Sequence, residues 1–286
     1  MRSSCDGAAE APPLTELAID KVVNKSIAMI GHSHLTAPAQ AYHRFYLADR
    51  ETPPPFTASF LQLRNSIYKP NLIANGDGSL KLNEVLKRHF ARGIQKRNPD
   101  LIVSCMFGNE YNFLAMLNHP QRFEFYLPSR LDLPTDERAE VLPVDLVEDL
   151  IRSRLENSLG VMLKEIAALT DGRCPLVHMP PPPPVRQTAH IEAHPNVFGK
   201  RIRRLGVSPA FFRLKMWLLT LKVQKELCEN AGVTFYRFPK AISDPDGFLG
   251  KAFLKNDPSH GNAQFGKIVL DDIVQTNFRS GKGEDA

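Results

Sequence analysis

The sequence predicts an α/β fold with a mainly parallel sheet that helices cover on both faces. Three observations predict it. Short apolar segments alternate along the chain with longer segments that repeat apolar residues at helical spacing. Most of the short segments end at a glycine or a proline, as strands do before a turn. The 286 residues, 43% hydrophobic and 23% charged, match an ordinary globular protein, and no apolar run reaches the roughly 18 residues of a membrane span.

Each expected strand is a short apolar run, most of them closed by a turn signal. The first, Ser26–Ile30, ends at Gly31. The second, Leu72–Ala74, ends at the turn Asn75-Gly76-Asp77-Gly78. The other three strands are expected at 101–107, 176–179 and 233–238.

Helices are expected where apolar residues recur every three or four positions. They lie at 39–47, 80–96, 211–230 and 262–278, and 144–169 forms one long helix or two joined helices. Together these elements predict a single domain at 25–280 with tails at 1–24 and 281–286. Insertions into this domain are expected near 35–70, 113–143 and 185–208.

The chain has a net charge of +5 from 36 basic and 31 acidic residues, and basic residues gather at 87–97 and 200–204. The first stretch interleaves them with Leu86, Phe90 and Ile94, the pattern of a helix with one solvated face. We therefore expect no nucleic-acid partner. The second stretch lies in an expected irregular loop, whose charge would suit a carbohydrate or an anionic substrate.

The four cysteines, at positions 5, 105, 174 and 228, follow no CxxC spacing, which argues against a zinc site and a disulfide framework. The first 13 residues lack the apolar core of a secretory signal. These features predict a cytoplasmic protein without a membrane span, a metal or another cofactor. The sequence makes no prediction of the oligomeric state.

Polar residues stand at three places where a strand ends or the last helix begins. Gly31-His32-Ser33-His34 follows the first expected strand, and Phe107-Gly108-Asn109-Glu110 ends the third. Asp257-Pro258-Ser259-His260 comes shortly before the last helix. Because ligands bind at the carboxyl ends of the strands in such folds, we expect these segments to form one site.

The residue types suit acyl transfer. A serine hydroxyl needs a neighbouring base, and an imidazole titrates near neutral pH. Asp257 precedes His260 by three residues, so its carboxylate can accept the ring N–H and fix the tautomer. Negative charge on the carbonyl oxygen then needs fixed hydrogen-bond donors. The candidates are the backbone N–H of Ser33, the backbone N–H of Gly76 or Gly78, and the side-chain amide of Asn109.

In carrying Ser33, a following glycine, Asn109 and Asp257-x-x-His260 in this order, the chain resembles the SGNH hydrolases, also called the GDSL family. The resemblance spans residues 26–278. It implies a three-layer α/β/α, flavodoxin-like fold of five parallel strands and an esterase, lipase or carbohydrate O-acyl esterase activity without a metal. It also implies that Ser33 is the nucleophile, His260 the base and Asp257 its partner, with Ser33, Gly76 or Gly78, and Asn109 as the oxyanion hole.

The chain departs from the family pattern at two places beside the expected site. His32 stands where the family usually has aspartate before the serine, and Phe107-Gly108-Asn109-Glu110 replaces Gly-x-Asn-Asp. Neither change removes a catalytic group, but both alter the expected substrate pocket. His34, Glu110 and Asn112 are expected to line that pocket.

Other classes of protein share some of these residues. His32-Ser33-His34 is also an H-x-H pattern, with which amidohydrolase barrels begin a metal site, although about five βα units are too few for such a barrel. A sugar O-acyltransferase or a catalytically silent binding protein on the same fold also stays open. The function predicted is a serine esterase that acts on a small acyl ester, such as an O-acetylated carbohydrate.

Three further features are predicted to be structural. His178, at the end of the fourth expected strand, is expected in the core, and so is Trp217. Pro180 to Pro184 are expected to form a rigid extended loop rather than a ligand for an SH3 domain.

Overall fold

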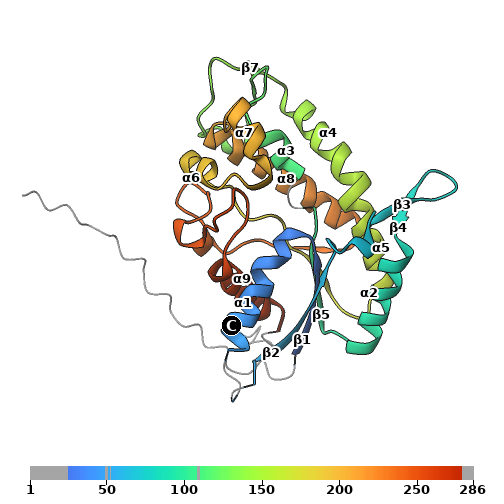
Figure 1. Ribbon diagram of the computed structural model, residues 1–286. Coiled ribbons are helices and arrows are strands. Elements are labelled where there is room, and N and C mark those ends of the chain that lie inside the picture. Colours follow the sequence, from blue (N-terminus) through green and yellow to red (C-terminus); the bar gives the residue numbers. More distant parts are fainter. Residues whose placement is uncertain (1–24, 49–50, 52, 108–109, 279–286) are drawn as a thin grey trace, which may run out of the picture.

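A parallel sheet of five strands forms the centre of the protein, in a computed structural model that describes residues 25–48, 51, 53–107 and 110–278 (Figure 1). The strand order is β2-β1-β5-β8-β9, and all four neighbouring pairs are parallel. This is the order of flavodoxin-like sheets and confirms the predicted fold class. The strands are β1 (Lys25–Gly31), β2 (Phe56–Gln62), β5 (Leu101–Cys105), β8 (Leu176–His178) and β9 (Thr234–Phe235).

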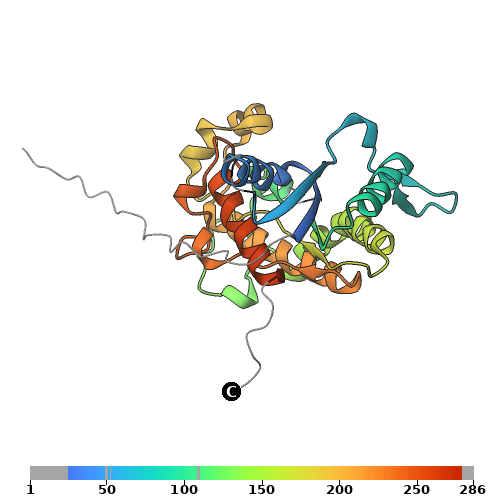
Figure 2. The ribbon, with the colours of Figure 1, turned by 90° about the horizontal axis from the view of Figure 1, so that it is seen from below.

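Helices cover both faces of the sheet, which makes three layers (Figures 1 and 2). Helices α1 (Thr36–Ala41) and α9 (Ala263–Phe278) lie side by side on one face. Helices α2 (Glu84–Arg97), α5 (Val161–Thr170) and α8 (Ala210–Asn230) cover the other face.

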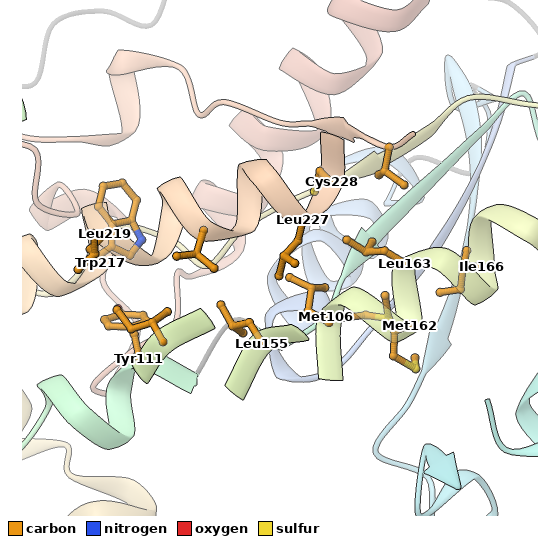
Figure 3. Packing of buried hydrophobic residues seen from close by; sticks show 14 of the residues in the cluster. Met106, Tyr111, Leu155, Met162, Leu163, Ile166, Trp217, Leu219, Leu227 and Cys228 are labelled. Carbon is orange, nitrogen blue, oxygen red and sulfur yellow. The ribbon is translucent and has the colours of Figure 1, made fainter. Parts of the chain in front are cut away.

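Strand β1 shows how the sequence specifies these layers. Its side chains alternate between the faces, so Ile27 and Met29 pack toward α1 and α9. Ala28 and Ile30 pack into the opposite core, part of which is drawn in Figure 3. A strand that is covered on both faces needs apolar residues at nearly every position, which is why this segment is a continuous apolar run.

Smaller elements surround the three layers. Helix α3 (Glu110–Ala115) follows β5, and α4 (Val144–Leu155) joins α5 through a π-helical turn at Glu156–Gly160, as the prediction of two joined helices allowed. Two pairs of short strands lie outside the main sheet: antiparallel β3 (Leu72–Ala74) and β4 (Leu80–Leu82), and parallel β6 (Phe123–Glu124) and β7 (Glu140–Val141). The short helical turns are η1 (Ser33–Leu35), η2 (Tyr42–Tyr46), η3 (Ser66–Tyr68), η4 (Pro128–Arg130), η6 (Asn196–Phe198), η7 (Lys240–Ile242) and η8 (Lys251–Phe253).

The prediction of the second strand of the sheet is wrong. Leu72–Ala74 does form a strand, but it belongs to the hairpin β3–β4, whereas the second strand of the sheet is β2. Strand β2 lies at the edge of the sheet and mixes apolar residues with Thr57 and Ser59, so it lacks the continuous apolar run of a central strand. Residues 35–70 therefore supply α1, η2 and an edge strand.

The segment 185–208 is more regular than expected. It contains α6 (Thr188–Ala193), η6 and α7 (Gly199–Leu205), so the basic residues at 200–204 lie on a helix instead of a loop. The basic residues of α2 form a solvated face, as predicted, because Leu86, Phe90 and Ile94 are its buried residues. Within the described part of the chain, no helix is both long and apolar enough to cross a membrane.

Helix α8 carries two buried cations. Lys215 pairs with the buried carboxylate of Glu124, with 2.6 Å between Nζ and Oε1. The guanidinium of Arg213 donates to the backbone carbonyl oxygens of Val185 (2.9 Å), Arg186 (3.0 Å) and Ser208. Burial lowers the pKa of Arg213 to about 10, so the side chain stays charged at neutral pH. This one side chain fastens both ends of the segment 185–208 to α8.

The residues predicted to be structural are buried. His178 is fully buried, and its Nδ1 lies 2.9 Å from the hydroxyl of Ser104. The five prolines at 180–184 are also buried, which excludes an exposed SH3 ligand, and the indole of Trp217 donates to the carbonyl oxygen of Pro181. Cysteines 105, 174 and 228 are buried free thiols, and Cys5 lies outside the described residues.

Candidate active site

Ser33 and His34 lie where β1 turns into the first helical segment. Gly31 ends the strand against β5, where a Cβ atom would lie 2.5 Å from the carbonyl oxygen of Cys105, so only glycine fits. The turn η1 then places Ser33 and His34 directly before α1, with 6% and 5% of their surfaces exposed. The sequence thus holds both side chains in a nearly buried corner at the carboxyl end of β1.

Asp257 and His260 lie in the loop that precedes α9. The Nδ1–H of His260 donates to Oδ1 of Asp257 at 2.6 Å, and the same oxygen accepts the backbone N–H groups of Ser259 (2.8 Å) and His260 (3.1 Å). The other carboxylate oxygen accepts from the side-chain amide of Asn196 at 3.2 Å. The three-residue spacing therefore produces the predicted carboxylate–imidazole pair within one turn.

The pKa of Asp257 is held well below its usual range. Burial by itself would raise it, but the hydrogen bond and charge of His260 and the donors from Ser259 and Asn196 outweigh burial. A permanently ionised carboxylate fixes the proton of His260 on Nδ1. The other ring nitrogen, Nε2, is then the proton acceptor of the neutral ring. It is buried, and no described residue donates a hydrogen bond to it.

The two segments meet through a pair of histidines. The rings of His34 and His260 lie 4.7 Å apart, centroid to centroid, at an angle of 37°. Because His34 follows Ser33 directly, this contact brings the beginning and the end of the domain together at one edge of the sheet. The His34 ring also covers one side of the His260 ring.

The close packing of α1 against α9 explains this convergence. At Gly266 in α9, a Cβ atom would lie 2.9 Å from the nitrogen of Pro38 and closer still to the carbonyl oxygen of Ala37. Without a side chain at this position the two helices can pack backbone to backbone. The helices in turn carry the segments with Ser33 and His260 at their N-terminal ends.

The side chain of His32 holds backbone segments around the site in place. Its Nδ1 accepts the N–H of Phe107 at 3.4 Å, and its Nε2 lies 3.0 Å from the carbonyl oxygen of the Asn71 side chain. Burial lowers the pKa of His32, and the charges of Arg64 and Lys69 lower it further, against the hydrogen bond with Asn71. His32 is thus a neutral ring that links the ends of β1 and β5.

These contacts contradict the alternative of a metal site on His32 and His34. A histidine ligand needs a free lone pair on one ring nitrogen, and both nitrogens of His32 are engaged within the protein. The residues that the structure describes also contain no group of three or more His, Cys, Asp or Glu side chains that could hold a metal ion.

The structure does not bring Gly76 and Gly78 to the site, and the expectation that one of them is an oxyanion donor needs correction. Both are exposed at the tip of the hairpin β3–β4, where a Cβ atom on either would have no neighbour within 4 Å. This hairpin projects away from α1 and α9 in both views (Figures 1 and 2). The cause is the misplaced second strand, because the chain after β2 continues through Leu63 and Arg64 and contains no glycine before Gly76.

The remaining predicted residues follow β5. Gly108 and Asn109 lie outside the described residues. Glu110 is the first residue of α3, and Asn112 in the same helix is 2% exposed. Their expected contacts with a substrate stay predictions.

Sequence reasoning missed Asn196 and Asn71. Asn196 lies in η6, 61 positions before the carboxylate that it contacts, and has a positive φ of 47°. Asn71 donates to the carbonyl oxygens of Leu63 (3.2 Å) and Tyr68 (2.8 Å) while it contacts His32. No local pattern marks either residue, because each acts across a tertiary contact.

An open cleft of about 710 Å³ lies beside the candidate residues. Leu35 and Thr36, which follow His34 in the chain, form part of its wall. Lys255 and Asn262, on either side of the Asp257–His260 turn, form another part. None of Ser33, His34, Asp257 and His260 lines the cleft itself, but residues one or two positions away from them in the chain do, and the cleft extends along α1 and the end of β2.

Comparisons with known proteins find similarity in overall shape alone. No family model matches the chain, and no curated protein matches it significantly in sequence. Among solved structures, it is similar to a GDSL-like lipase from Bacteroides thetaiotaomicron, with a TM-score of 0.43 and 10% identity over 88% of this chain and 87% of that chain. A putative acylhydrolase from Bacteroides fragilis gives a TM-score of 0.43 and 10% identity over 88% and 86% of the two chains. A variant of an acetyl xylan esterase from Geobacillus stearothermophilus gives 0.39 and 13% identity over 92% and 100%.

Proposed function

We propose that the protein is a serine-dependent ester hydrolase of the SGNH type that acts on a small acyl ester, for example an O-acetylated carbohydrate. One observation carries the proposal: His260 is bonded through Nδ1 to an ionised carboxylate and keeps Nε2 buried and ready to accept a proton. The contact of its ring with His34 puts it beside the Ser33 segment. These contacts support assigning Ser33 as the nucleophile, His260 as the base and Asp257 as the carboxylate that orients the base.

In the proposed reaction, Ser33 Oγ attacks the carbonyl carbon of the ester while Nε2 of His260 takes the hydroxyl proton. The carbon–oxygen bond to the alcohol then breaks, and the alcohol leaves with that proton. In the second half, His260 takes a proton from water as the water attacks the acyl carbon, and Ser33 leaves with that proton. One ester and one water thus give one acid and one alcohol. Asp257 stabilises the imidazolium that forms in both halves, since its own pKa is far too low for it to take the proton.

The carbonyl oxygen becomes negative in each tetrahedral intermediate and needs donors. We propose the backbone N–H of Ser33, at the start of the helical segment, and the side-chain amide of Asn109. A glycine donor from the hairpin is not part of this proposal. We assign His34 to holding the ring of His260, because the two rings pack against each other.

Hydrolysis of p-nitrophenyl acetate tests the proposal. Ser33→Ala is expected to lower kcat by at least about a thousandfold, because loss of a nucleophile removes the acyl-enzyme route. Ser153→Ala is the matched control, since Ser153 is exposed on α4 and its hydroxyl donates to the carbonyl oxygen of Leu150 in its own helix. Equal rates for wild type and Ser33→Ala would end the proposal.

Covalent labelling gives a second test that does not depend on finding the substrate. A fluorophosphonate probe should modify the peptide that contains Ser33, as read by mass spectrometry. Asp257→Asn should slow this labelling by disturbing the His260 tautomer. Labelling confined to another serine would contradict the assignment.

A further inference from the structure

The cleft beside the candidate site is built from two parts of the chain. One wall is formed by residues between Leu35 and Arg44, which lie in η1, α1 and η2, together with the end of β2. The other wall contains Lys255, two residues before Asp257, and the start of α9. Because Leu35 and Thr36 follow Ser33 closely in the chain, the cleft is the place we assign to one of the two halves of an ester bound at Ser33.

The charge of the cleft has one sign. Arg44 and Lys255 line it, and among the described residues no aspartate or glutamate does. Within the described part of the chain, neither Arg44 nor Lys255 lies within ion-pair distance of a carboxylate, and Arg44 rests over the ring of Phe45. By contrast, Lys267, on the same face of the sheet, pairs with Asp271 at 2.8 Å. A cleft with uncompensated cations attracts an anion, and an arginine can bind a carboxylate through two hydrogen bonds.

The remaining lining suits a hydroxylated ring. Thr36, Gln40 and Gln62 offer neutral hydrogen-bonding groups, and the ring of Phe60 offers a partly exposed apolar face. With its amide turned so that the nitrogen donates to the carbonyl oxygens of Gly31 (2.8 Å) and His32 (2.9 Å), Gln62 presents its side-chain oxygen as an acceptor. Sugars present both hydroxyl groups and an apolar face, and the lining offers both kinds of surface, since Leu35, Ala39 and Ala263 add apolar groups.

We infer that this cleft binds the alcohol half of the substrate, and that this half is a sugar carrying an anionic group that Arg44 and Lys255 recognise. This inference rests on the proposed esterase function and names its substrate class. It replaces the expectation that residues 200–204 receive an anion, since none of them lines the cleft.

The test compares two substrates that differ in one charge: mono-O-acetylated methyl glucuronide and mono-O-acetylated methyl glucoside. The measured quantity is the ratio of kcat/KM for the charged to the neutral ester. Arg44→Gln with Lys255→Gln should lower this ratio at least about tenfold, because only the charged ester loses charge-assisted hydrogen bonds when both cations are removed. Arg44→Lys with Lys255→Arg should restore most of it, because both charges remain.

Arg92→Gln with Lys96→Gln is the control, because it removes two exposed charges from α2, on the opposite face of the sheet. We call Arg44→Gln with Lys255→Gln the cleft variant. An unchanged ratio in the cleft variant, or an equal fall of the ratio in the α2 control, would overturn the inference. A second pair, p-nitrophenyl acetate and p-nitrophenyl monosuccinate, places the charge on the acyl half. If the cleft variant affects only this second pair, the sugar assignment is wrong.

Direct binding separates this inference from the proposed catalysis. Calorimetric titration of Ser33→Ala with methyl glucuronide should detect binding that the cleft variant weakens at least about tenfold. If binding follows this pattern but no ester is hydrolysed, the proposed hydrolysis fails and the anion site stands. If p-nitrophenyl acetate is hydrolysed in a Ser33-dependent way but neither binding nor the ratio responds to the cleft variant, the anion site fails alone.

Discussion

The backbone of Ala37 lies directly against Gly266, so that α1 and α9 touch without an intervening side chain. We predict that Gly266→Ala lowers the free energy of unfolding by about 1–3 kcal/mol, the usual cost of overpacking. Because the same contact brings the segment of Ser33 and His34 against that of His260, the proposed esterase activity should fall as well. Urea denaturation and p-nitrophenyl acetate hydrolysis measure the two effects.

The control for this change is Gly93→Ala in α2. A Cβ atom there would meet nothing within 4 Å, and alanine in a helix interior is more stable than glycine by roughly 0.5–1 kcal/mol. This variant should therefore be as stable as wild type or more so, with full activity. If Gly266→Ala behaved in the same way, the helices could not be as closely packed as described.

The buried ring of His178 predicts a pH-dependent stability. Burial lowers the pKa of His178 from 6.5 to about 4, so the folded protein resists protonation that the unfolded chain accepts. The stabilising difference is present above about pH 6.5 and is lost as the pH falls toward 4, amounting to about 3 kcal/mol at 1.36 kcal/mol for each pKa unit. Urea denaturation from pH 4 to 8 should show wild type losing more stability in this window than His178→Gln. The control is His43→Gln, which changes an exposed ring and should lose stability with falling pH as wild type does. If His178→Gln also lost as much free energy of unfolding as wild type between pH 6.5 and 4, the prediction would be wrong.

Asn196 is predicted to position the carboxylate of Asp257. Asn196→Ala should lower kcat by roughly tenfold with little change in KM, since a hydrogen bond to a charged group contributes about 1.5 kcal/mol or more. Asn196→Asp keeps the shape but adds a second carboxylate, which favours the protonated imidazole and should move the acid limb of the pH–rate profile to higher pH. A role in folding alone would leave that limb in place. Asn157→Ala, at an exposed position, serves as the matched control.

Lys200 and Arg201 are exposed on α7 and do not line the cleft. Neutralising both to glutamine should leave the charged-to-neutral substrate ratio within about twofold of wild type, because exposed charges at a distance are screened by salt. The measurement uses the same pair of acetylated sugars. A tenfold fall in this ratio would indicate that α7, and not Arg44, binds the anionic group.

The strands that sequence reasoning located well are those buried on both faces. Ser26–Ile30 and Leu101–Cys105 lie in the middle of the sheet, where nearly every side chain must be apolar, and the pattern is therefore visible in the sequence. Phe56–Gln62 forms the edge strand and is half exposed, so its pattern is mixed and it was missed. The prediction took the apolar segment Leu72–Ala74 as the second strand of the sheet. It therefore expected Gly76 or Gly78, which follow that segment, at the edge of the sheet beside Ser33.

In the candidate site, local contacts could be predicted and distant ones could not. The hydrogen bond between Asp257 and His260 spans three residues, so the spacing alone indicates it. The contacts of Asn196 with Asp257 and of Asn71 with His32 span 61 and 39 positions and depend on how separate segments pack. The role of Ser33 as a nucleophile stays a prediction that the variants above test.

Arg213 binds the segment 185–208 only through main-chain oxygen atoms at its two ends. A carbonyl group is present whatever the residue, so this attachment places no demand on the side chains in between. The stretch that includes α6 and α7 can therefore change at its exposed positions while its ends stay anchored, whereas Ile191, Phe198 and Ile202 are buried in a hydrophobic cluster and must stay apolar. Two of its polar side chains reach the neighbourhood of the candidate site: Asn196 donates to Asp257, and Nε2 of His190 lies 2.9 Å from the carbonyl oxygen of Lys255. Around these two contacts, the exposed surface of the segment is free to diverge without disturbing the carboxylate that orients His260.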